Sequence, residues 1–217
     1  MKNLLKQVDR DTIEAFSHSH ESSPIGKHRF FSVLVPFVEK DGKLQLLFER
    51  RANHMESQPG EICFPGGNMD EGESPLECAL RETYEEIGIS KDDIEVLCQG
   101  NTLYGYANYT LYTHLAFVDE KSIENAVLSK DEVDEIFTVP ISEFTEDILY
   151  VSKQKIVTKL ENFPYDRYGI DEDYSWRIGS WDIPLYDVCG EKIWGLTARI
   201  IWDILHEICI FCSKFTK

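Results

Sequence analysis

The sequence predicts a single domain of the α+β class with a helix near each end. The chain has 217 residues, which fits one domain and is long enough to bury a core. Hydrophobic residues make up 42% and charged residues 28%, so a disordered or fibrous chain is excluded. Strand and helix patterns are mixed along the chain, without internal repeats or low-complexity linkers. This pattern favours one domain over 1–217, with a core at about 29–160.

The first part of the chain is predicted to form a helix and a strand hairpin. Residues 3–17 are predicted as a short amphipathic helix, followed by a polar connection over 17–27. Its expected inward positions are Leu4, Leu5, Val8 and Ile13. The apolar runs 31–38 and 44–48 flank the turn residues Asp41-Gly42. These two runs are therefore predicted to pair as a hairpin.

The second half is predicted to contain strands and a long final helix. The expected strands are 94–98, 109–118, 135–139 and 149–157. Residues 161–182 are rich in aromatic and turn residues and are expected to form a long loop. The final helix, over about 193–212, has a stripe at the spacing of one buried face. That stripe is Thr197, Ile200, Ile201, Ile204, Leu205 and Ile208. Its charged residues predict an amphipathic helix rather than a membrane span.

The charge balance narrows the function classes. The chain has 22 basic and 39 acidic residues, a net charge of −17. This acidity argues against binding to a nucleic acid polymer or to an anionic membrane. It permits a small phosphorylated substrate, because bound cations can invert the local field. Residues 1–10 lack the apolar segment of a secretory signal, so we expect a cytoplasmic protein whose six cysteines are thiols.

A helix is predicted directly after a glycine-rich turn. Ser74 suits the N-cap, Pro75 the first helical position, and Glu77 completes a capping box. Gly88 is typical of the residue that ends a helix. The helix is therefore expected over 75–87. Its predicted core positions are Leu76, Ala79, Leu80, Thr83 and Ile87.

Three carboxylates occupy another face of this helix. Glu82, Glu85 and Glu86 lie within about one turn, where like charges destabilise a helix. A hard cation bound between them would make the arrangement favourable, and oxygen ligands suit Mg²⁺ or Mn²⁺. Glu73 could reach the same site, and Arg81 could pair with Glu73 or with Glu85. The alternative is a solvated acidic face without a ligand.

The complete spacing decides between these two interpretations. The relevant residues are Gly67, Glu73, Arg81, Glu82, Glu85, Glu86, Gly88 and Ile89. This pattern closely resembles the sequence box of the Nudix hydrolases. Thr83 stands where that family usually has an aliphatic residue. Because Thr83 lies on the predicted core face, we expect the difference to affect packing rather than chemistry.

The resemblance implies a fold, a reaction class and a set of site residues. The fold would be a mixed β-sheet sandwiched between helices, an α/β/α arrangement, and the reaction would be hydrolysis of a nucleoside diphosphate linked to another group. By resemblance, the metal ligands would be Glu82, Glu85 and Glu86, with the Gly67 carbonyl as a candidate fourth. Glu73 and Arg81 would support the geometry.

A further carboxylate could act as general base. The acidic segment 131–135 precedes a predicted strand, and Glu132 is the candidate there. A solvated loop is the alternative for any single acid in this segment.

Two other segments resemble the coenzyme A diphosphatase branch of the family. They are 47–67, with its Gly60-to-Gly67 loop, and 193–198. In this motif Glu49 and Ala52 replace the usual Thr and Ser, and Glu56 replaces a usual Arg. The branch implies cleavage of coenzyme A or acyl-CoA to 3′,5′-ADP and (acyl-)4′-phosphopantetheine.

Substrate contacts are expected from two arginines and two glycines. Arg50 and Arg51 are candidate phosphate partners, since a guanidinium can bind phosphate bidentately. The alternative is that one of them pairs with a neighbouring acid. Gly66 and Gly67 allow close approach of the backbone to a ligand. Tyrosines that could stack on adenine, or pack at a sheet edge instead, are Tyr104, Tyr106, Tyr109 and Tyr112.

Other functions remain open at this point. A Nudix hydrolase for ADP-ribose, a dinucleotide or an oxidised nucleotide is the alternative enzyme. A catalytically silent nucleotide sensor is disfavoured, because it has no need for mutually repelling carboxylates. An acidic structural or interaction protein is the alternative outside the family. The partner expected is a small nucleotide, and a homodimer is an open expectation.

Overall fold

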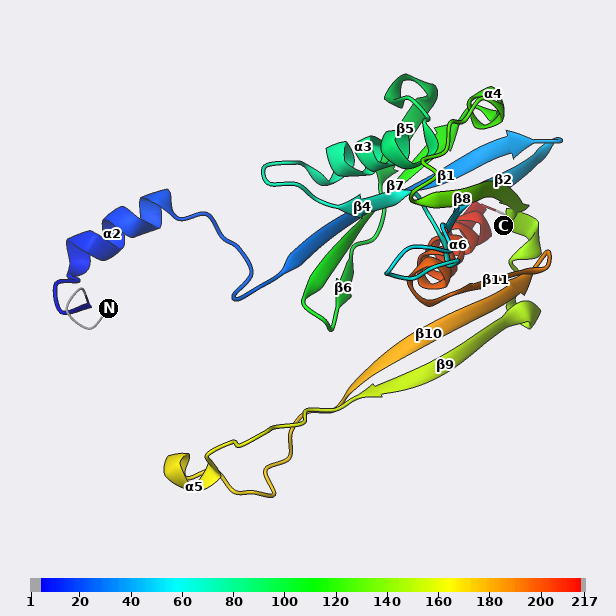
Figure 1. Cartoon of the computed structure of the whole chain (residues 1–217). Coiled ribbons are helices and arrows are strands. Elements are labelled where there is room, and N and C mark those ends of the chain that lie inside the picture. The colour runs from blue at the N-terminus through cyan, green and yellow to red at the C-terminus, as the bar shows by residue number, and fades with distance from the viewer. Residues whose placement is uncertain (1–4, 216–217) are drawn as a thin grey trace.

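The computed structural model describes residues 5–215 and contains a large mixed sheet, a small second sheet and several helices (Figure 1). The eight strands of the large sheet are β1 (Arg29–Lys40), β2 (Lys43–Arg51), β3 (Ile62–Cys63), β4 (Gly66–Asn68), β5 (Ile94–Gln99), β6 (Leu103–Gly105), β7 (Tyr109–Val118) and β8 (Val133–Pro140). The second sheet contains β9 (Leu149–Ile156), β10 (Gly179–Val188) and β11 (Glu191–Trp194). The α-helices are α2 (Arg10–Ser19), α3 (Pro75–Ile87), α4 (Glu120–Glu124), α5 (Tyr165–Tyr168) and α6 (Gly195–Phe215). Short 3₁₀ helices are Lys91–Asp93, Ile141–Glu143 and Glu146–Ile148.

The large sheet combines antiparallel and parallel pairs. Its main path runs β3-β2-β1-β7-β5, with β4 paired to β1, β6 to β7 and β8 to β2. Strands β1 and β2 pair antiparallel around the turn at Asp41-Gly42, which confirms the predicted hairpin. Strands β1 and β7 pair in parallel from Arg29↔Tyr109 to Phe37↔Phe117. The sheet is therefore mixed, as predicted.

Alternation along the central strands separates the two faces of this sheet. On β1, Leu34 and Val38 pack in the cluster that contains Ala79 and Ile87 of α3. The intervening Val35 packs in the cluster that contains residues of α6. Because successive side chains of a strand point to opposite faces, α3 and α6 cover opposite sides of the sheet (Figure 1). This is the predicted α/β/α arrangement.

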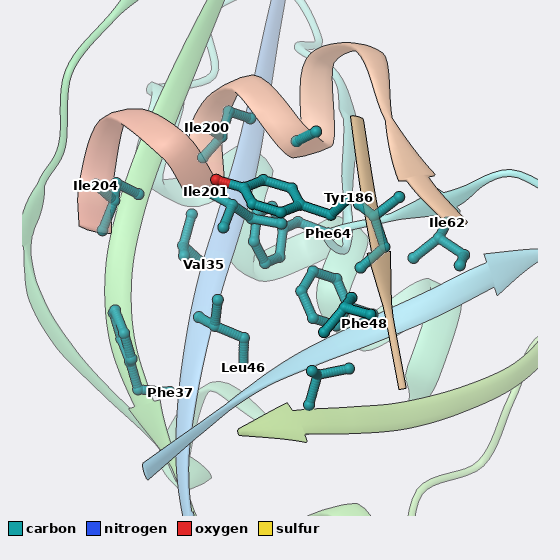
Figure 2. Close-up of a cluster of buried hydrophobic side chains, with 14 of the residues drawn as sticks. Val35, Phe37, Leu46, Phe48, Ile62, Phe64, Tyr186, Ile200, Ile201 and Ile204 are labelled. Carbon is teal, nitrogen blue, oxygen red and sulfur yellow. The ribbon is translucent and has the colours of Figure 1, made fainter. Parts of the chain in front are cut away.

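The cluster on the α6 side joins the two sheets. Phe48 is fully buried, and its ring lies 5.0 Å from that of Phe64 and 6.2 Å from that of Phe144. Phe144 in turn meets Tyr186 of β10 edge to face at 5.2 Å. The α6 residues of the predicted stripe close this cluster (Figure 2): Ile200, Ile201 and Ile204. That the whole chain is one domain stays a prediction.

The N-terminal prediction was wrong about packing. Helix α2 begins at Arg10 and has no buried residue. The side chain of Ile13 on this helix is 56% exposed, and that of Val8, which precedes the helix, is 42% exposed. Leu5 is 65% exposed, and Leu4 lies outside the described residues. Figure 1 shows α2 apart from the sheets, beyond the polar connection. The helical period correctly indicated a helix, but periodicity does not say what covers its apolar face.

The predicted loop over 161–182 was only partly correct. It contains the short helix α5, and β10 begins within it at Gly179. Strand β10 pairs with β9 from Gly179↔Ile156 onward, so its position depends on long-range pairing. No helix within the described residues has both the length and the apolar character that crossing a membrane requires.

Candidate active site

Helix α3 begins and ends where the capping residues predict. Ser74 Oγ accepts a hydrogen bond from the Glu77 backbone N–H at 3.3 Å, and Glu77 Oε2 accepts one from the Ser74 backbone N–H at 2.9 Å. Gly88 ends the helix with φ of 71°. Thr83 is buried, and its hydroxyl donates to the Ala79 carbonyl at 2.6 Å. The helix thus tolerates this hydroxyl on its core face, because the hydroxyl finds a partner within the helix.

The two glycines of the turn lie directly against the acidic face of α3. The Gly66 N–H donates to Glu86 Oε2 at 2.8 Å. Gly66 has φ of +149°, and a Cβ there would overlap the Ser32 carbonyl oxygen. A Cβ on Gly67 would lie 2.6 Å from Glu82 Oε1. Each glycine therefore allows the turn and the acidic helix to approach within contact distance.

This contact gives a first prediction, for Gly67→Ala. We expect the variant to fold, because the obstructed atoms belong to the end of a flexible side chain. We also expect kcat to fall by about 100-fold, since small displacements of a reacting group can cost that much. Measuring kcat and Tm together checks this prediction, with Gly179→Ala as the control because its Cβ would make ordinary contacts. Unchanged kcat in Gly67→Ala would contradict it.

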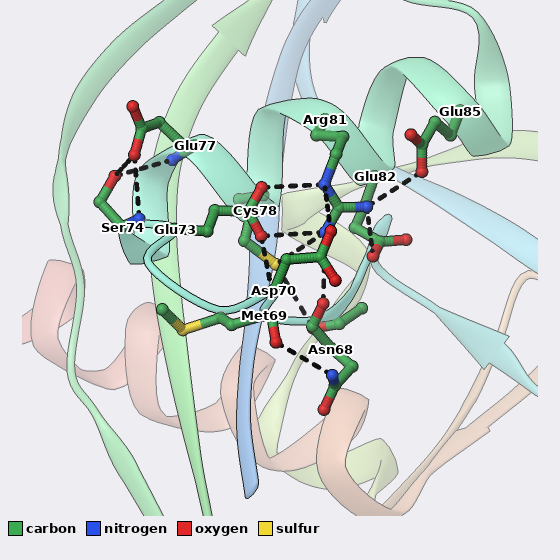
Figure 3. Close-up of polar contacts among 12 residues, drawn as sticks. Asn68, Met69, Asp70, Glu73, Ser74, Glu77, Cys78, Arg81, Glu82 and Glu85 are labelled. Carbon is green, nitrogen blue, oxygen red and sulfur yellow. Dashed lines mark hydrogen bonds and ion pairs between the residues drawn. The ribbon is translucent and has the colours of Figure 1, made fainter. Parts of the chain in front are cut away.

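Arg81 connects the acids on and before α3 (Figure 3). Its Nε donates to Glu73 Oε1 at 2.8 Å, and its Nη1 donates to Glu82 Oε1 at 2.8 Å and to Glu85 Oε2 at 3.0 Å. Its Nη2 also reaches the Asn68 carbonyl at 3.2 Å. The hydrogen bonds from Arg81 lower the pKa of Glu73 to about 2. Both pairings considered for Arg81 are therefore present, and Glu73 holds Arg81 rather than entering the acidic cluster itself.

The acids nearest to the sheet are strongly affected by burial. Burial raises the pKa of Glu86 to about 9, and it also raises the pKa of Glu82. The negative charge of Glu132 contributes to both shifts, although Glu132 itself is exposed. Glu132 lies in the loop, directly before the first residue of β8, and its charge acts on the acids of α3.

Glu49 is a member of this cluster that the sequence analysis did not assign to the site. It lies on β2, is 1% exposed, and accepts a hydrogen bond from the Cys63 thiol at 3.2 Å. Burial raises its pKa to about 7, with smaller contributions from the charges of Glu132 and Glu82. The signal available in the sequence was the strand alternation, which puts Glu49 on the same face as the core residue Leu47.

The chemistry of the cluster fits a hard divalent cation. Within residues 5–215, no three acidic, histidine or cysteine side chains converge as a ready-made metal site. Without a cation the carboxylates repel one another, and Arg81 draws Glu82 and Glu85 toward itself. The second oxygen of Glu49 is buried without a hydrogen-bond partner among these residues. All of these donors are oxygens, which suit Mg²⁺ or Mn²⁺.

The Gly67 carbonyl, the candidate fourth ligand, lies at the same place. The thiol of Cys78 donates to it at 3.6 Å, which is a weak interaction. Cys78 is fully buried, and burial raises the pKa of its thiol to about 12. The neutral thiol therefore fills space between α3 and the turn.

A cavity of about 650 Å³ adjoins the glycine turn on the α6 side of the sheet. Polar and aromatic residues from separate segments line it: Arg29, Arg51, Gln58, Glu61, Tyr106 and Trp181. The Trp181 ring meets the Tyr106 ring edge to face at 5.3 Å. The Arg51 Nε is buried and has no hydrogen-bond partner in the part of the chain that the structure describes. This cavity thus offers aromatic rings and an unpaired cation beside the acidic cluster.

The two candidate arginines lie in different surroundings. Arg50 donates to Glu135 and to Glu191, both at 2.7 Å, and packs over the Phe137 ring. It is not among the residues that line the cavity, whereas Arg51 is. The register of β2 against β8 shifts between Arg50 and Arg51, and such a bulge can redirect a side chain. Arg50 therefore follows the alternative in which one arginine pairs with neighbouring acids.

The tyrosines also divide between the cavity and other positions. Tyr106 and Tyr109 line the cavity. Tyr104 is 74% exposed outside it, and Tyr112 stacks on Phe30 with ring centroids 6.5 Å apart. Only the first two are therefore placed where they could contact a ligand in this cavity.

The C-terminal segment contacts the loop that precedes the glycine turn. Thr197 Oγ1 donates to the Ile62 carbonyl at 3.0 Å, and Trp194, Gly195 and Leu196 line the cavity. The two segments that resemble the coenzyme A diphosphatase branch are thus neighbours in space, although they are far apart in the sequence.

Comparison with known proteins identifies the class. The NUDIX domain family matches residues 28–160. The chain is 37% identical over 146 residues to Nudix hydrolase 3 of Caenorhabditis elegans, covering 62% of this chain and 61% of that protein. It is 38% identical over 126 residues to the peroxisomal coenzyme A diphosphatase NUDT7 of Mus musculus, covering 57% and 52%. The chain belongs to the Nudix hydrolase family, which confirms the resemblance.

A solved structure supports the fold. The MutT/nudix family protein from Enterococcus faecalis has a TM-score of 0.50 and 19% sequence identity, and the match covers 94% of this chain and 71% of that chain. The present chain matches only 61%, 52% and 56% of the length of the first three curated relatives. The family and fold are therefore shown, and the substrate is a separate question.

Proposed function

We propose that this protein is a metal-dependent pyrophosphohydrolase that cleaves coenzyme A or acyl-CoA to 3′,5′-ADP and (acyl-)4′-phosphopantetheine. The observation that carries the proposal is the juxtaposition at the glycine turn. There the acids of α3 lie on one side, bonded through Glu86 to the Gly66 N–H, and the cavity lies on the other. A pyrophosphate seated at the turn would contact both.

The metal ligands in this proposal are Glu82, Glu85, Glu86 and the Gly67 carbonyl. Bound Mg²⁺ or Mn²⁺ would supply neutralisation of the phosphate oxygens, acidification of a water and stabilisation of the leaving phosphate. Arg81 would hold Glu82 and Glu85 in place through the hydrogen bonds described above. Glu73, which we also count among the catalytic residues, would hold the guanidinium of Arg81 in position through its hydrogen bond.

Glu132 is the proposed general base. It is exposed, so its carboxylate can reach a water molecule, and it lies close enough to Glu82 and Glu86 to raise their pKa values. Accepting the proton of the attacking water would be its role.

The cavity supports a substrate with a large non-phosphate part. Its volume of about 650 Å³ is within the range of small-molecule sites. Tyr106 and Trp181 offer rings for a base or an apolar chain, and Arg51 offers an unpaired guanidinium for a phosphate. Two of the curated relatives are named peroxisomal coenzyme A diphosphatases, which favours this branch.

A substrate panel tests the proposal. Coenzyme A, acetyl-CoA, ADP-ribose and a dinucleoside polyphosphate would each be incubated with Mn²⁺ or Mg²⁺ in ¹⁸O water, and the products identified by mass spectrometry. We expect coenzyme A or its acyl form to be hydrolysed fastest, with ¹⁸O in one phosphate product. Much faster turnover of ADP-ribose would overturn the branch. Saturable nucleotide binding without any hydrolysis would favour the silent sensor.

A second prediction separates the two arginines. Arg51→Ala is expected to raise KM for coenzyme A by about tenfold or more, because a charge-assisted hydrogen bond to phosphate contributes about 1.5–3 kcal/mol. Arg50→Ala is the matched variant. It is expected to lower Tm, since Glu135 and Glu191 lose their partner, while KM changes by less than about twofold. Steady-state kinetics and thermal unfolding of both variants check this, and equal KM effects would contradict it.

We further propose a cytoplasmic location and a homodimer. The cysteines at positions 63, 78, 98, 189 and 209 are free thiols, which fits a reducing compartment. Exposed apolar residues such as Phe16 on α2 support self-association. Cell fractionation and light scattering would test these two proposals.

A further inference from the structure

Glu49 is an acid buried in the large sheet with only half of its carboxylate accounted for. Its Oε1 accepts a hydrogen bond from the Cys63 thiol, with 3.2 Å between the oxygen and the sulfur. Its Oε2 is buried and has no hydrogen-bond partner among the described residues. A buried polar atom without a partner costs free energy, so sequences rarely retain one without a reason. A role confined to the bond with Cys63 leaves the second oxygen unexplained.

Strand geometry places Glu49 on the face of the sheet that α3 covers. Leu47, two residues earlier on β2, packs with the residues of α3, and the intervening Phe48 packs on the opposite side. Because side chains alternate along a strand, Glu49 points to the same side as Leu47. That side carries Glu82 and Glu86.

The electrostatic effects on Glu49 also place it near the acids of α3. The charges of Glu82 and Glu132 act on the Glu49 carboxyl group, and the charge of Glu49 acts on Glu86. In the described part of the chain, neither Glu49 nor Glu86 forms an ion pair with a basic side chain, because Arg81 is taken up by other acids. The charge of Arg51 acts on Glu49 in the opposite sense but forms no ion pair with it, so Glu49 and Glu86 are two buried, neighbouring acids without an ion-pair partner among the described residues.

We propose that Glu49 is a ligand of the divalent cation bound by Glu86, adding an oxygen from the sheet to those of the helix. The proposal rests on the metal-dependent function proposed above and adds to the acids of α3 a residue that the sequence box does not include. A dication at this position would satisfy the free Oε2 and would offset the repulsion between the two buried acids. The oxygen-only donor set remains suited to Mg²⁺ or Mn²⁺.

The test is a titration of the full chain with Mn²⁺, in which electron paramagnetic resonance of the free ion measures how much Mn²⁺ is bound. The variants are Glu49→Gln, Glu49→Thr and, as a control that removes the same charge from an exposed position of the same sheet, Glu39→Gln. We expect Glu49→Thr to weaken Mn²⁺ binding by at least about 10–100-fold, because loss of an outer-shell partner of a metal already costs that much. Glu49→Gln should fall between Glu49→Thr and wild type, and Glu39→Gln should bind as wild type does.

Thermal unfolding without metal separates ligation from folding. A ligand role predicts metal-free Tm values of the Glu49 variants equal to or above that of wild type, because a buried acid without an ion-pair partner has been removed. Wild-type Mn²⁺ affinity in Glu49→Thr would overturn the proposal and leave the proposed function intact. Loss of folding in both variants would also overturn it, since Glu49 would then be structural. A wild-type chain that neither binds Mn²⁺ nor hydrolyses any substrate of the panel would overturn the proposed function as well.

Discussion

Glu82→Gln and Glu86→Gln are each expected to lower kcat by more than about 100-fold while the fold is retained. Loss of an outer-shell partner of a metal typically costs about 10–100-fold, and these residues are proposed as direct ligands. The amide oxygen of Gln can still accept the hydrogen bonds from Arg81 and from the Gly66 N–H, so the local structure should persist. The measurement is steady-state hydrolysis of coenzyme A with Mn²⁺.

Stability in the absence of metal provides the second part of this test. Glu82→Gln removes one charge from the crowded acids, and Glu86→Gln replaces a buried acid that already holds a proton at neutral pH, so the metal-free Tm should be unchanged or higher. Glu39→Gln serves as the charge-matched control, with wild-type kcat expected. Retained turnover in both Glu82→Gln and Glu86→Gln would refute the assignment of the site.

The metal-free protein is expected to lose stability as the pH rises from about 6.5 to about 8.5. Burial raises the pKa of Glu86 from its ordinary value of 4.5 to about 9, so in this window the folded protein holds a proton that the unfolded chain has released. A raised folded-state pKa contributes stability at low pH that is lost as the pH rises toward that pKa. The slope is at most about 1.4 kcal/mol per pH unit for one proton.

Metal should reverse this trend. Binding of a dication requires the carboxylates in their charged form, so Mn²⁺ affinity rises with pH. At about 100 times Kd, Mn²⁺ should stabilise the fold by about 2.7 kcal/mol, which corresponds to a Tm increase of about 5–10 °C for a chain of this size. Thermal unfolding with and without Mn²⁺ across this pH range measures both effects.

Glu86→Gln is the control for the pH effect. The variant has no proton to lose at this position, so its metal-free Tm should depend less on pH than that of wild type. Burial lowers the pKa of His114, so the contribution of His114 to stability rises with pH, opposite in sign to that expected from Glu86. Equal pH dependence of the two metal-free proteins would rule out Glu86 as the source.

Features set by neighbouring residues were predicted well from the sequence. The capping residues Ser74 and Gly88 gave the bounds of α3 to the residue, and the turn at Asp41-Gly42 gave the hairpin of β1 and β2. The stripe on α6 also packs as its spacing predicted. Each of these signals lies within a single helix or a single pair of consecutive strands, so local interactions are sufficient to specify it.

Features that depend on distant segments were predicted poorly. The apolar positions of α2 have no partner in the core, and β10 was missed because it forms by pairing with β9 across a long connection. Arg50 and Arg51 are adjacent in the sequence, yet one pairs with Glu191 and the other lines the cavity. Sequence spacing alone does not distinguish two neighbouring residues whose surroundings come from elsewhere in the chain.

The sequence by itself determined the family and the acidic face of α3, because helical periodicity places residues three and four apart on one side. Only the tertiary structure decided which other groups join that face. Pairing of β2 with β3 and β8 brings Glu49 and Glu132 to the helix, and a bulge separates the environments of Arg50 and Arg51. The physical reason is that charges from separate segments interact only when long-range packing has brought them together, and burial then changes their protonation.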